Sequence, residues 1–521
     1  MPLRPRPLPA QAAAAGPVPA AWTRAAAAVL AALALARLLL LFATPLELYP
    51  DEAQYWAWSR LLDWGYFSKP PMIAWLIAAS TAIGGNAEAW VRLPAWLCQT
   101  AAGGLVFLAG RRLYDARIGF WAATLYALAP GVLLSSGVAS TDAPLLLFLS
   151  AAIWAYAGLL QGRRIGWAAA LGGAVGLAVL SKYAAAYFVV GLVAHALVSS
   201  QARRAWRPAT LAVAAGALAA CLAPNLLWNA LNGFDTVRHT ASNANWSVSD
   251  LFHPAELASF LDAQFGLLGP VPFVALLTGT GWAIVGRGRL EDRERLLLCL
   301  LAPPLLLVAV QALLSRANAN WAAAFLPPAA ILVAAWLCGP SRFARTGLFL
   351  ALLSQTVFHA IFAAVIVSPA AASAIGLDNG FKRARGWAAT SEAVRRSVAA
   401  AGPISAVAVD DRFLFNALLY YGRDWLGRPG GPPLTAWLRE GEARNQAETT
   451  DPLTPAFGRR VLAVGLTPDY REAFRGDFRT AGSSATVRIP LDRRRTRELD
   501  VFVGEGFSPR PRILSGRPTG S

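Results

Sequence analysis

The stretch WTRAAAAVLAALALARLLLLFATPLELYPDE, residues 22–52, decides the class of this fold. Its first part, Trp22 to Leu41, is almost wholly apolar and is long enough to cross a bilayer as one helix. A signal peptide would end in a small-residue cleavage site, and LFATPLELYPDE does not offer one. We therefore expect a retained first membrane helix, followed closely by the adjacent carboxylates Asp51 and Glu52.

The composition of the whole chain agrees with a membrane protein. Of its 521 residues, 56% are hydrophobic and only 15% are charged, and the mean hydropathy is +0.44, far from that of a soluble domain. In a membrane protein, a net charge of +17 reflects the side of the bilayer on which the arginines lie. It therefore does not indicate nucleic acid as a partner. The four cysteines all fall in apolar runs, which favours buried thiols over disulfides or a metal site.

Apolar runs of spanning or near-spanning length recur along the chain and predict about eleven transmembrane helices. Basic connections alternate with arginine-poor ones, which places the N-terminus in the cytoplasm and residues 44–89 in a first outer loop. The runs cover residues 22–43, 90–109, 118–138, 144–160, 166–181, 183–199, 208–228, 265–285, 296–314, 321–338 and 346–368.

The tail, residues 369–521, predicts a small α/β soluble domain on the outer side. GWAATSEAVRRSVAAA has helical periodicity, whereas ISAVAVD, RRVLAVGL, SATVRIP and LDVFVGE are typical of short strands. The chain therefore divides into a cytoplasmic N-terminal segment, 1–21, a membrane domain, 22–368, and this tail. The first segment and the last residues, from Ser508 onward, are rich in proline or small residues and are expected to be disordered.

Charged residues at the outer ends of the predicted helices are the candidates for chemistry, because ionisable groups near hydrocarbon are costly and tend to be functional. Asp51 and Glu52 lie in the first outer loop, and Asp142 lies between the third and fourth predicted helices. Asp142 in STDAPLLLF also has the features of a helix N-cap, and both roles are compatible.

Lysine is scarce, since only Lys69, Lys182 and Lys382 occur beside 44 arginines. A lysine retained at the outer face suits the binding of a phosphate by a compact point charge, and Lys69 and Lys182 both lie there. The loops 229–264 and 315–320 add Arg238, His239 and Asn320 as candidate ligands. No histidine spacing typical of metal binding is present, so a metal site is a minority interpretation.

Aromatic residues crowd the first outer loop. Tyr55, Trp58 and Tyr66 are candidates for substrate binding, although a belt at the membrane interface explains such residues equally well. No nucleotide-binding loop is visible. An enzyme with outward-facing carboxylates would then need an activated substrate delivered in the bilayer, such as a sugar linked to a lipid phosphate.

Six stretches together resemble the bacterial membrane glycosyltransferases of the C-type fold, the group of the dolichyl-phosphate-mannose protein mannosyltransferases and the aminoarabinose lipid A transferases. They occur in the expected order over roughly residues 45–340. The stretches are PDEAQYWAWS, GYFSKPPMIAWLIA, AEAWVRLPAWL, STDAPLLLF, GLAVLSKYAAAYF and ANWAAAFLPPAAIL.

The resemblance implies a polyprenyl-phosphate sugar donor, an inverting transfer on the periplasmic side of the bacterial inner membrane, and a glycolipid or protein acceptor. It places Asp51 as the catalytic acid–base residue, Asp142 as the second acidic position and Lys69 on the donor phosphate, with Lys182 or Arg238 assisting. Glu52 completes the Asp-Glu pair of the branch. The aminoarabinose transferases have a metal-linked glutamate where this chain has Ser68, so a divalent metal is not supported. A transporter of lipid-linked sugars and an aminoarabinose- or uronosyl-type lipid A transferase are the alternatives.

Overall fold

The computed structural model describes residues 18–162, 164–242, 244, 246, 251–286 and 290–512. The disorder predicted for the two ends falls mainly on residues 1–17 and 513–521, which lie outside the described residues. Helix α1 (Val18–Ala43) begins at the first described residue and contains the first predicted span.

Every predicted apolar run falls on helical structure in the described part of the chain. Seven segments there are long and apolar enough to cross a membrane by themselves. They are α1, α4 (Glu88–Leu113), α7 (Asp142–Gly162), α11 (Pro208–Leu231), α15 (Asp292–Leu314), α17 (Arg342–Val367) and the pair formed by η2 (Ala319–Phe325) and α16 (Leu326–Leu337).

Two further spans are bent, which raises the number to nine. Helices α5 (Ala116–Leu128) and α6 (Pro130–Ser136) meet at 63°, and α13 (Pro254–Leu268) and α14 (Pro270–Ile284) meet at 114°. The predictions of one continuous helix over 118–138 and over 265–285 are therefore wrong. Gly269 has a φ of 101°, which ends α13, and Pro270 starts the next helix because it has no N–H to donate.

Two apolar helices are shorter than the spans above. They are α8 (Ile165–Ser181) and α9 (Ala186–Val198), the second preceded by η1 (Tyr183–Ala185). Because their lengths do not decide whether each crosses the bilayer alone, the count of eleven transmembrane helices stays a prediction. Short helices α10 (Ser200–Ala205) and α12 (Asp235–Ser242) complete this half of the chain.

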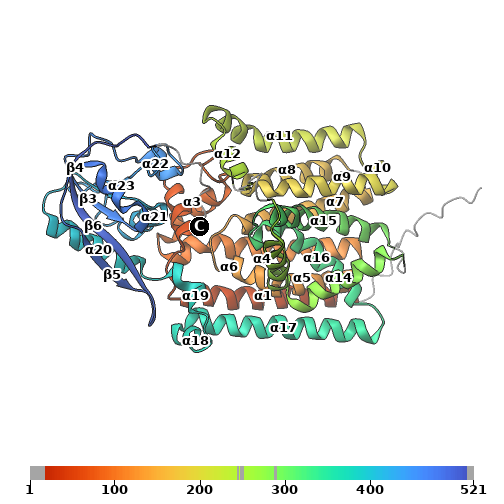
Figure 1. Ribbon diagram of the computed structural model, residues 1–521. Coiled ribbons are helices and arrows are strands. Elements are labelled where there is room, and N and C mark those ends of the chain that lie inside the picture. Colours follow the sequence, from red (N-terminus) through yellow and green to blue (C-terminus); the bar gives the residue numbers. More distant parts are fainter. Residues whose placement is uncertain are drawn as a thin grey trace, which may run out of the picture.

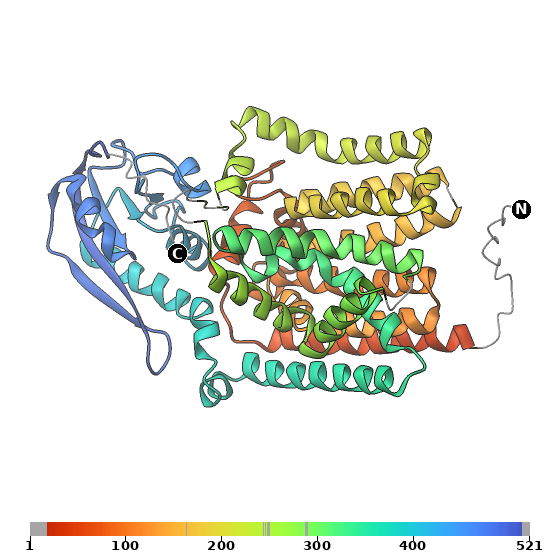
Figure 2. The ribbon, with the colours of Figure 1, turned by 45° about the vertical axis from the view of Figure 1, so that its right-hand side comes forward.

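The membrane helices run side by side, and a small sheet domain sits beyond one end of them (Figure 1). The largest buried cluster lies among the helices and includes Val106, Leu149, Leu297 and Ile331. Helices α1 and α17 form one edge of the bundle and α11 the other, an arrangement that Figure 2 also shows. The structure is that of a multi-pass α-helical membrane protein, as the sequence predicts.

The first loop, residues 44–89, is folded. It contains α2 (Pro50–Trp58) and α3 (Met72–Gly84). Pro50 occupies the first turn of α2, where its missing N–H costs nothing, and the two acidic residues that follow favour a helix start. Leu48, Trp56 and Ile73 are buried together in this loop.

The tail is an α/β domain, as predicted, and its six-stranded sheet has the order β2-β1-β3-β6-β4, with β5 also paired to β6. Strands β1, β2 and β3 are parallel, and β6 runs antiparallel to its neighbours. The strands are β1 (Ala406–Val409), β2 (Leu434–Ala436), β3 (Arg460–Gly465), β4 (Phe478–Ala481), β5 (Ala485–Pro490) and β6 (Thr496–Phe507). The helices are α18 (Pro369–Ala374), α19 (Asp378–Phe381), η3 (Lys382–Ala384), α20 (Trp387–Ala401), α21 (Arg412–Tyr421), α22 (Gln446–Thr450), η4 (Pro468–Tyr470) and α23 (Arg471–Gly476).

Both faces of this sheet are buried. Alternate residues of β1 point to opposite faces, so Val407 packs in the cluster of α20 and α21 while Ala408 packs with Trp437 and Phe474. Such burial explains why the predicted strands are short, continuous apolar runs.

The sheet domain is fixed to the first loop by hydrogen bonds. The Glu47 carboxylate accepts from the backbone N–H groups of Trp387 and Ala388 and so caps α20. The Leu48 N–H donates to the Tyr421 hydroxyl at 2.7 Å, and the Phe67 N–H donates to Gln446 Oε1 at 2.8 Å. Side chains from two distant parts of the sequence therefore meet at this junction.

Candidate active site

The adjacent carboxylates Asp51 and Glu52 have different surroundings. Glu52 is fully buried, and its oxygens accept from Arg92 Nε and Nη2, both at 2.9 Å, from the Tyr49 N–H at 2.9 Å and from the Ala139 N–H at 2.8 Å. All of these donors are fixed by the loop or by membrane helices. Glu52 therefore joins α2 to α4 and to the segment before α7.

Asp51 is exposed in the first turn of α2. Within the described part of the chain, its carboxylate has no hydrogen bond or ion pair. Burial lowers the pKa of Lys69 and raises that of Tyr55; the charge of Asp51 opposes the first shift and adds to the second. Asp51 is thus an exposed carboxylate whose charge acts on Lys69, on a helix that Glu52 holds in place.

Asp142, Lys182 and Asn320, three residues singled out separately in the sequence, form one cluster. Lys182 Nζ lies 2.7 Å from Asp142 Oδ1, and Asn320 Nδ2 donates to Asp142 Oδ2 at 2.7 Å. They come from the start of α7, the residue that ends α8, and η2. The cluster therefore ties together three helix ends on the side of the bundle that faces the first loop.

Lys69 and Lys182 line the same cavity, which has a volume of about 310 Å³. Burial lowers the pKa of Lys69, and the positive charges of Lys182 and Arg412 lower it further, against the opposing effect of Asp51 and Asp142. In the described part of the chain Lys69 has no ion-pair partner, whereas Lys182 is paired with Asp142. The cavity also has aromatic and polar walls, formed in part by Tyr183, Tyr187, Gln311 and Trp321.

His239 and Tyr55 lie in the same electrostatic surroundings. Burial lowers the pKa of His239 to about 4, with Lys69 and Arg412 adding to the effect, so this imidazole is neutral at pH 7. Its ring centre lies 5.7 Å from that of Phe67. Burial raises the pKa of Tyr55 well above its ordinary value, and the charges of Asp51 and Asp142 act in the same direction. Both side chains can therefore offer neutral hydrogen-bonding groups beside the charged ones.

Trp58 and Tyr66 are packed against each other. Their ring planes are parallel to within 2° and their centres are 4.7 Å apart. Both side chains are buried, and the Tyr66 hydroxyl donates to the Trp58 carbonyl at 3.0 Å. The Tyr66 backbone N–H also donates to the Lys69 carbonyl at 3.1 Å. The stacked pair and this bond together fix the loop that carries Lys69.

Arg238 does not line the lysine cavity. It pairs with Asp235 at 2.7 Å, and its side chain is 70% exposed. Arg412, which the sequence analysis missed, is the arginine that acts on Lys69 and His239. A signal for it exists, because Arg412 follows the predicted strand ISAVAVD, and ligands of parallel sheets bind beyond the carboxyl ends of strands.

A metal site gains no support from the described residues. Among them, no group of three or more His, Cys, Asp or Glu side chains is placed to hold a metal ion. Ser68, at the position where the aminoarabinose transferases have a glutamate, accepts from Gln54 Nε2 at 3.5 Å.

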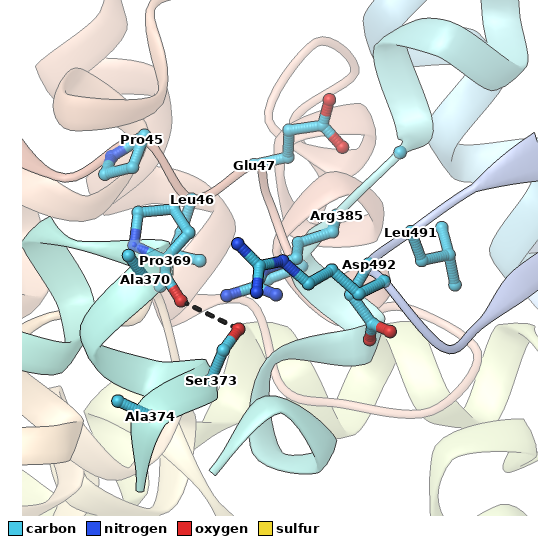
Figure 3. Close-up of a pocket in the computed structure, with 13 residues that line it drawn as sticks. Pro45, Leu46, Glu47, Pro369, Ala370, Ser373, Ala374, Arg385, Leu491 and Asp492 are labelled. Carbon is cyan, nitrogen blue, oxygen red and sulfur yellow. Dashed lines mark hydrogen bonds between the residues drawn. The ribbon is translucent and has the colours of Figure 1, made fainter. Parts of the chain in front are cut away.

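A larger cavity, about 580 Å³, lies on another side of the loop, between the ends of α1 and α17 and the sheet domain (Figure 3). Its walls include Glu47, Ser373 and Arg385, and the Ser373 hydroxyl donates to the Pro369 carbonyl at 3.1 Å. None of the clustered acids and lysines lines it. The smaller cavity is therefore the candidate site, because Lys69 and Lys182 line it and Lys182 contacts Asp142.

Comparison with known proteins identifies this chain as a membrane glycosyltransferase. Residues 68–228 match the family described as dolichyl-phosphate-mannose-protein mannosyltransferase. The lipid A galacturonosyltransferase RgtD of Rhizobium johnstonii is 37% identical over 416 residues, which is 78% of this chain and 85% of that protein. The chain belongs to the same family, that of the C-type-fold glycosyltransferases.

Solved structures agree on the fold. ArnT from Cupriavidus metallidurans bound to undecaprenyl phosphate has a TM-score of 0.61 and 17% identity, covering 95% of this chain and 99% of that chain. ArnT in the apo state has a TM-score of 0.58 and 16% identity, covering 93% and 98%. The similarity extends over both the membrane helices and the sheet domain.

Proposed function

We propose that this glycosyltransferase moves a uronic acid from a polyprenyl-phosphate donor to a lipid A-type glycolipid. The observation that carries the proposal is the pair Lys69 and Lys182 in one cavity. The exposed carboxylate Asp51, whose charge acts on Lys69, is the proposed base. Two results support the substrates: the related RgtD is named for galacturonosyl transfer to lipid A, and a structure of the same fold holds undecaprenyl phosphate.

In the proposed reaction, Asp51 takes the proton from an acceptor hydroxyl. The hydroxyl oxygen attacks the anomeric carbon, and the bond between that carbon and the phosphate oxygen breaks on the opposite face, so the configuration inverts. The polyprenyl phosphate leaves with the electron pair, and Lys69 stabilises its added negative charge. A positioned general base typically contributes about 10²- to 10⁴-fold, and an electrostatic stabiliser of this kind roughly 10²-fold or more.

The other clustered residues have supporting roles in this proposal. Asp142 and Asn320 orient Lys182 toward the phosphate, since Asp142 contacts both of them. Glu52 is a positioning residue, because its buried oxygens are occupied and cannot take a proton from a substrate. Tyr55 and His239 lie at the edge of the site as candidate sugar ligands, and Arg238 is left out of the donor site.

We place the protein in a bacterial inner membrane with its site on the periplasmic side. Residues 22–368 form the transferase domain, and residues 369–521 form a periplasmic domain that covers the first loop. The alternation of basic connections supports this orientation. A protein acceptor is a second candidate, favoured only by the mannosyltransferase description of the matched family.

The test uses purified protein in lipid nanodiscs with polyprenyl-phosphate galacturonic acid and lipid A. We expect release of polyprenyl phosphate and a labelled lipid A from wild type but not from Asp51→Asn. Asp424→Asn is the matched control, because that side chain is 76% exposed in the sheet domain. Bound donor without release, for uronosyl and hexosyl donors alike, would instead favour a transporter of lipid-linked sugars.

A further inference from the structure

Arg37 is a buried cation within a membrane helix. It lies on α1, before the end of that helix at Ala43, and its side chain is only 7% exposed. A rise of 1.5 Å per residue places it roughly 9 Å along α1 from the end nearest the sheet domain. An ionised side chain at such a depth is costly unless it is paired, and residues of this kind commonly serve a function.

The hydrogen-bond partners of Arg37 are neutral. Its Nη2 donates to the Ala127 carbonyl and lies 3.1 Å from His359 Nε2 on α17. That carbonyl belongs to the last turn of α5, which lacks helical partners because the helix ends just before Pro130. His359 Nδ1 lies 3.0 Å from the Gln355 carbonyl, so Nδ1 donates there and Nε2 accepts from Arg37. These contacts leave the positive charge uncompensated.

The described part of the chain supplies no counter-charge to Arg37. None of its carboxylates forms an ion pair with this arginine, and the Arg37 Nε is buried without a hydrogen-bond partner there. The guanidinium therefore keeps both its charge and an N–H for an anion.

Arg37 lines a pocket of about 70 Å³ between α1, α6 and α17. A cavity of that size has room for several water molecules or for one phosphate group. Arg92 also lines it, but its charge is balanced by Glu52. The hydroxyls of Thr44 and Ser136 add polar groups. The apolar walls are formed by Leu40, Leu41, Leu133, Leu134, Phe362 and Ile366.

The pocket lies at an edge of the bundle, where α1 and α17 run side by side (Figures 1 and 2). Leu134 in its wall is 41% exposed, and Leu39 and Phe42 on the adjoining part of α1 are 63% and 55% exposed. Exposed apolar side chains on membrane helices face hydrocarbon. A free ion would have to leave water to reach Arg37, whereas a lipid can bring its phosphate there and keep its chains on the apolar walls.

We propose that this pocket binds an anionic phospholipid, with its phosphate on Arg37 and its acyl chains along Leu134, Phe362 and Ile366. The bound lipid reinforces the contact of α1 with α17, where the Thr44 hydroxyl already donates to the Ile366 carbonyl at 3.0 Å. No residue of the lysine cavity lines this pocket, so the inference stands apart from the donor and acceptor proposed above.

The test uses native mass spectrometry of the delipidated full-length protein in detergent, with phosphatidylglycerol and phosphatidylcholine of identical acyl chains. We expect wild type to bind phosphatidylglycerol at least about tenfold more tightly, because the choline group compensates the phosphate charge of the other lipid. Loss of a hydrogen bond to a charged group predicts that Arg37→Gln weakens phosphatidylglycerol binding by about 10- to 100-fold. Binding of phosphatidylcholine should change less than about twofold.

Leu134→Trp is a second variant, needed because Arg37→Gln also loses the contact with Ala127 and can fail to fold. It narrows the pocket and leaves Arg37 in place, so phosphatidylglycerol binding should fall while the melting temperature without lipid stays that of wild type. Arg428→Gln is the control, because Arg428 is an exposed arginine of the sheet domain that pairs with Asp424. Its lipid binding should equal that of wild type.

Three results would overturn the inference. Equal affinity of wild type for the two phospholipids would leave the pocket to water. Unchanged phosphatidylglycerol binding in Leu134→Trp and in folded Arg37→Gln would place the lipid elsewhere. Displacement of bound phosphatidylglycerol by lipid A, but not by phosphatidylcholine, would assign the pocket to the acceptor.

Discussion

Glu52 and Arg92 lie buried against each other, with two hydrogen bonds of 2.9 Å between the carboxylate and the guanidinium. The next residue toward the N-terminus, Asp51, is exposed. Two adjacent acids therefore have different surroundings. Glu52 holds helix α2 against the membrane bundle, and Asp51 is open to solvent.

Replacing Asp51 with Asn should remove catalysis and leave the fold intact. The side chain has no hydrogen bond or ion pair within the described residues, so its loss breaks no contact. We expect sugar transfer to fall by about 10²- to 10⁴-fold, as for loss of a general base. Transfer rates together with thermal unfolding of the two proteins check this, and a transfer rate equal to that of wild type would rule out Asp51 as the base.

Replacing Glu52 with Gln should instead destabilise the folded protein. It leaves the Arg92 guanidinium buried without its counter-charge, and breaking a buried pair typically costs about 3–5 kcal/mol. We expect a lower melting temperature and poor recovery of folded protein. Thermal unfolding in detergent measures the change, and a protein that was as stable as wild type but inactive would mean that Glu52 acts in catalysis.

The pH dependence of the reaction should reflect the protonation state of Lys69. The lysine must be charged to hold the phosphate, and burial lowers its pKa below the ordinary 10.5. Because the charged form exists below the pKa, kcat/KM should be lost as the pH rises through that lowered value. Lys69→Arg stays charged at high pH and should lose this alkaline fall. The same alkaline fall in both proteins would assign it to another group.

Asp142 and Lys182 should behave as one unit. Removing either partner frees the other from their 2.7 Å contact, so the two single substitutions share part of their effect. In a double-mutant cycle of Asp142→Asn and Lys182→Met, we expect a coupling of about 0.5–3 kcal/mol in kcat/KM. Additive effects would show that the contact does not serve the reaction.

The junction of the two domains should depend on Glu47. Its carboxylate caps α20 from the first loop, and a lost cap costs about 0.5–2 kcal/mol. Glu47→Gln should therefore increase hydrogen exchange at residues 387–390 while the membrane helices keep their protection. Exchange measured by mass spectrometry tests this, and unchanged exchange would show that other contacts hold the junction.

The sequence alone was enough to predict the membrane class, the helical runs and the α/β tail. Long apolar runs and short strands are local signals. They can be read from the sequence because the transfer of apolar side chains out of water is favourable at any position in the chain. Scarce lysines and outer-face acids likewise singled out Lys69, Lys182, Asp142 and Asn320, which the fold brings together.

Only the tertiary structure decided what each charge does. Burial separates Glu52 from Asp51, because Arg92 is 40 residues away in the chain and closes over one of them only. The charge of Arg412 reaches Lys69 because a distant domain docks on the first loop. These features depend on which partners meet in space, and composition and spacing carry no record of such long-range contacts.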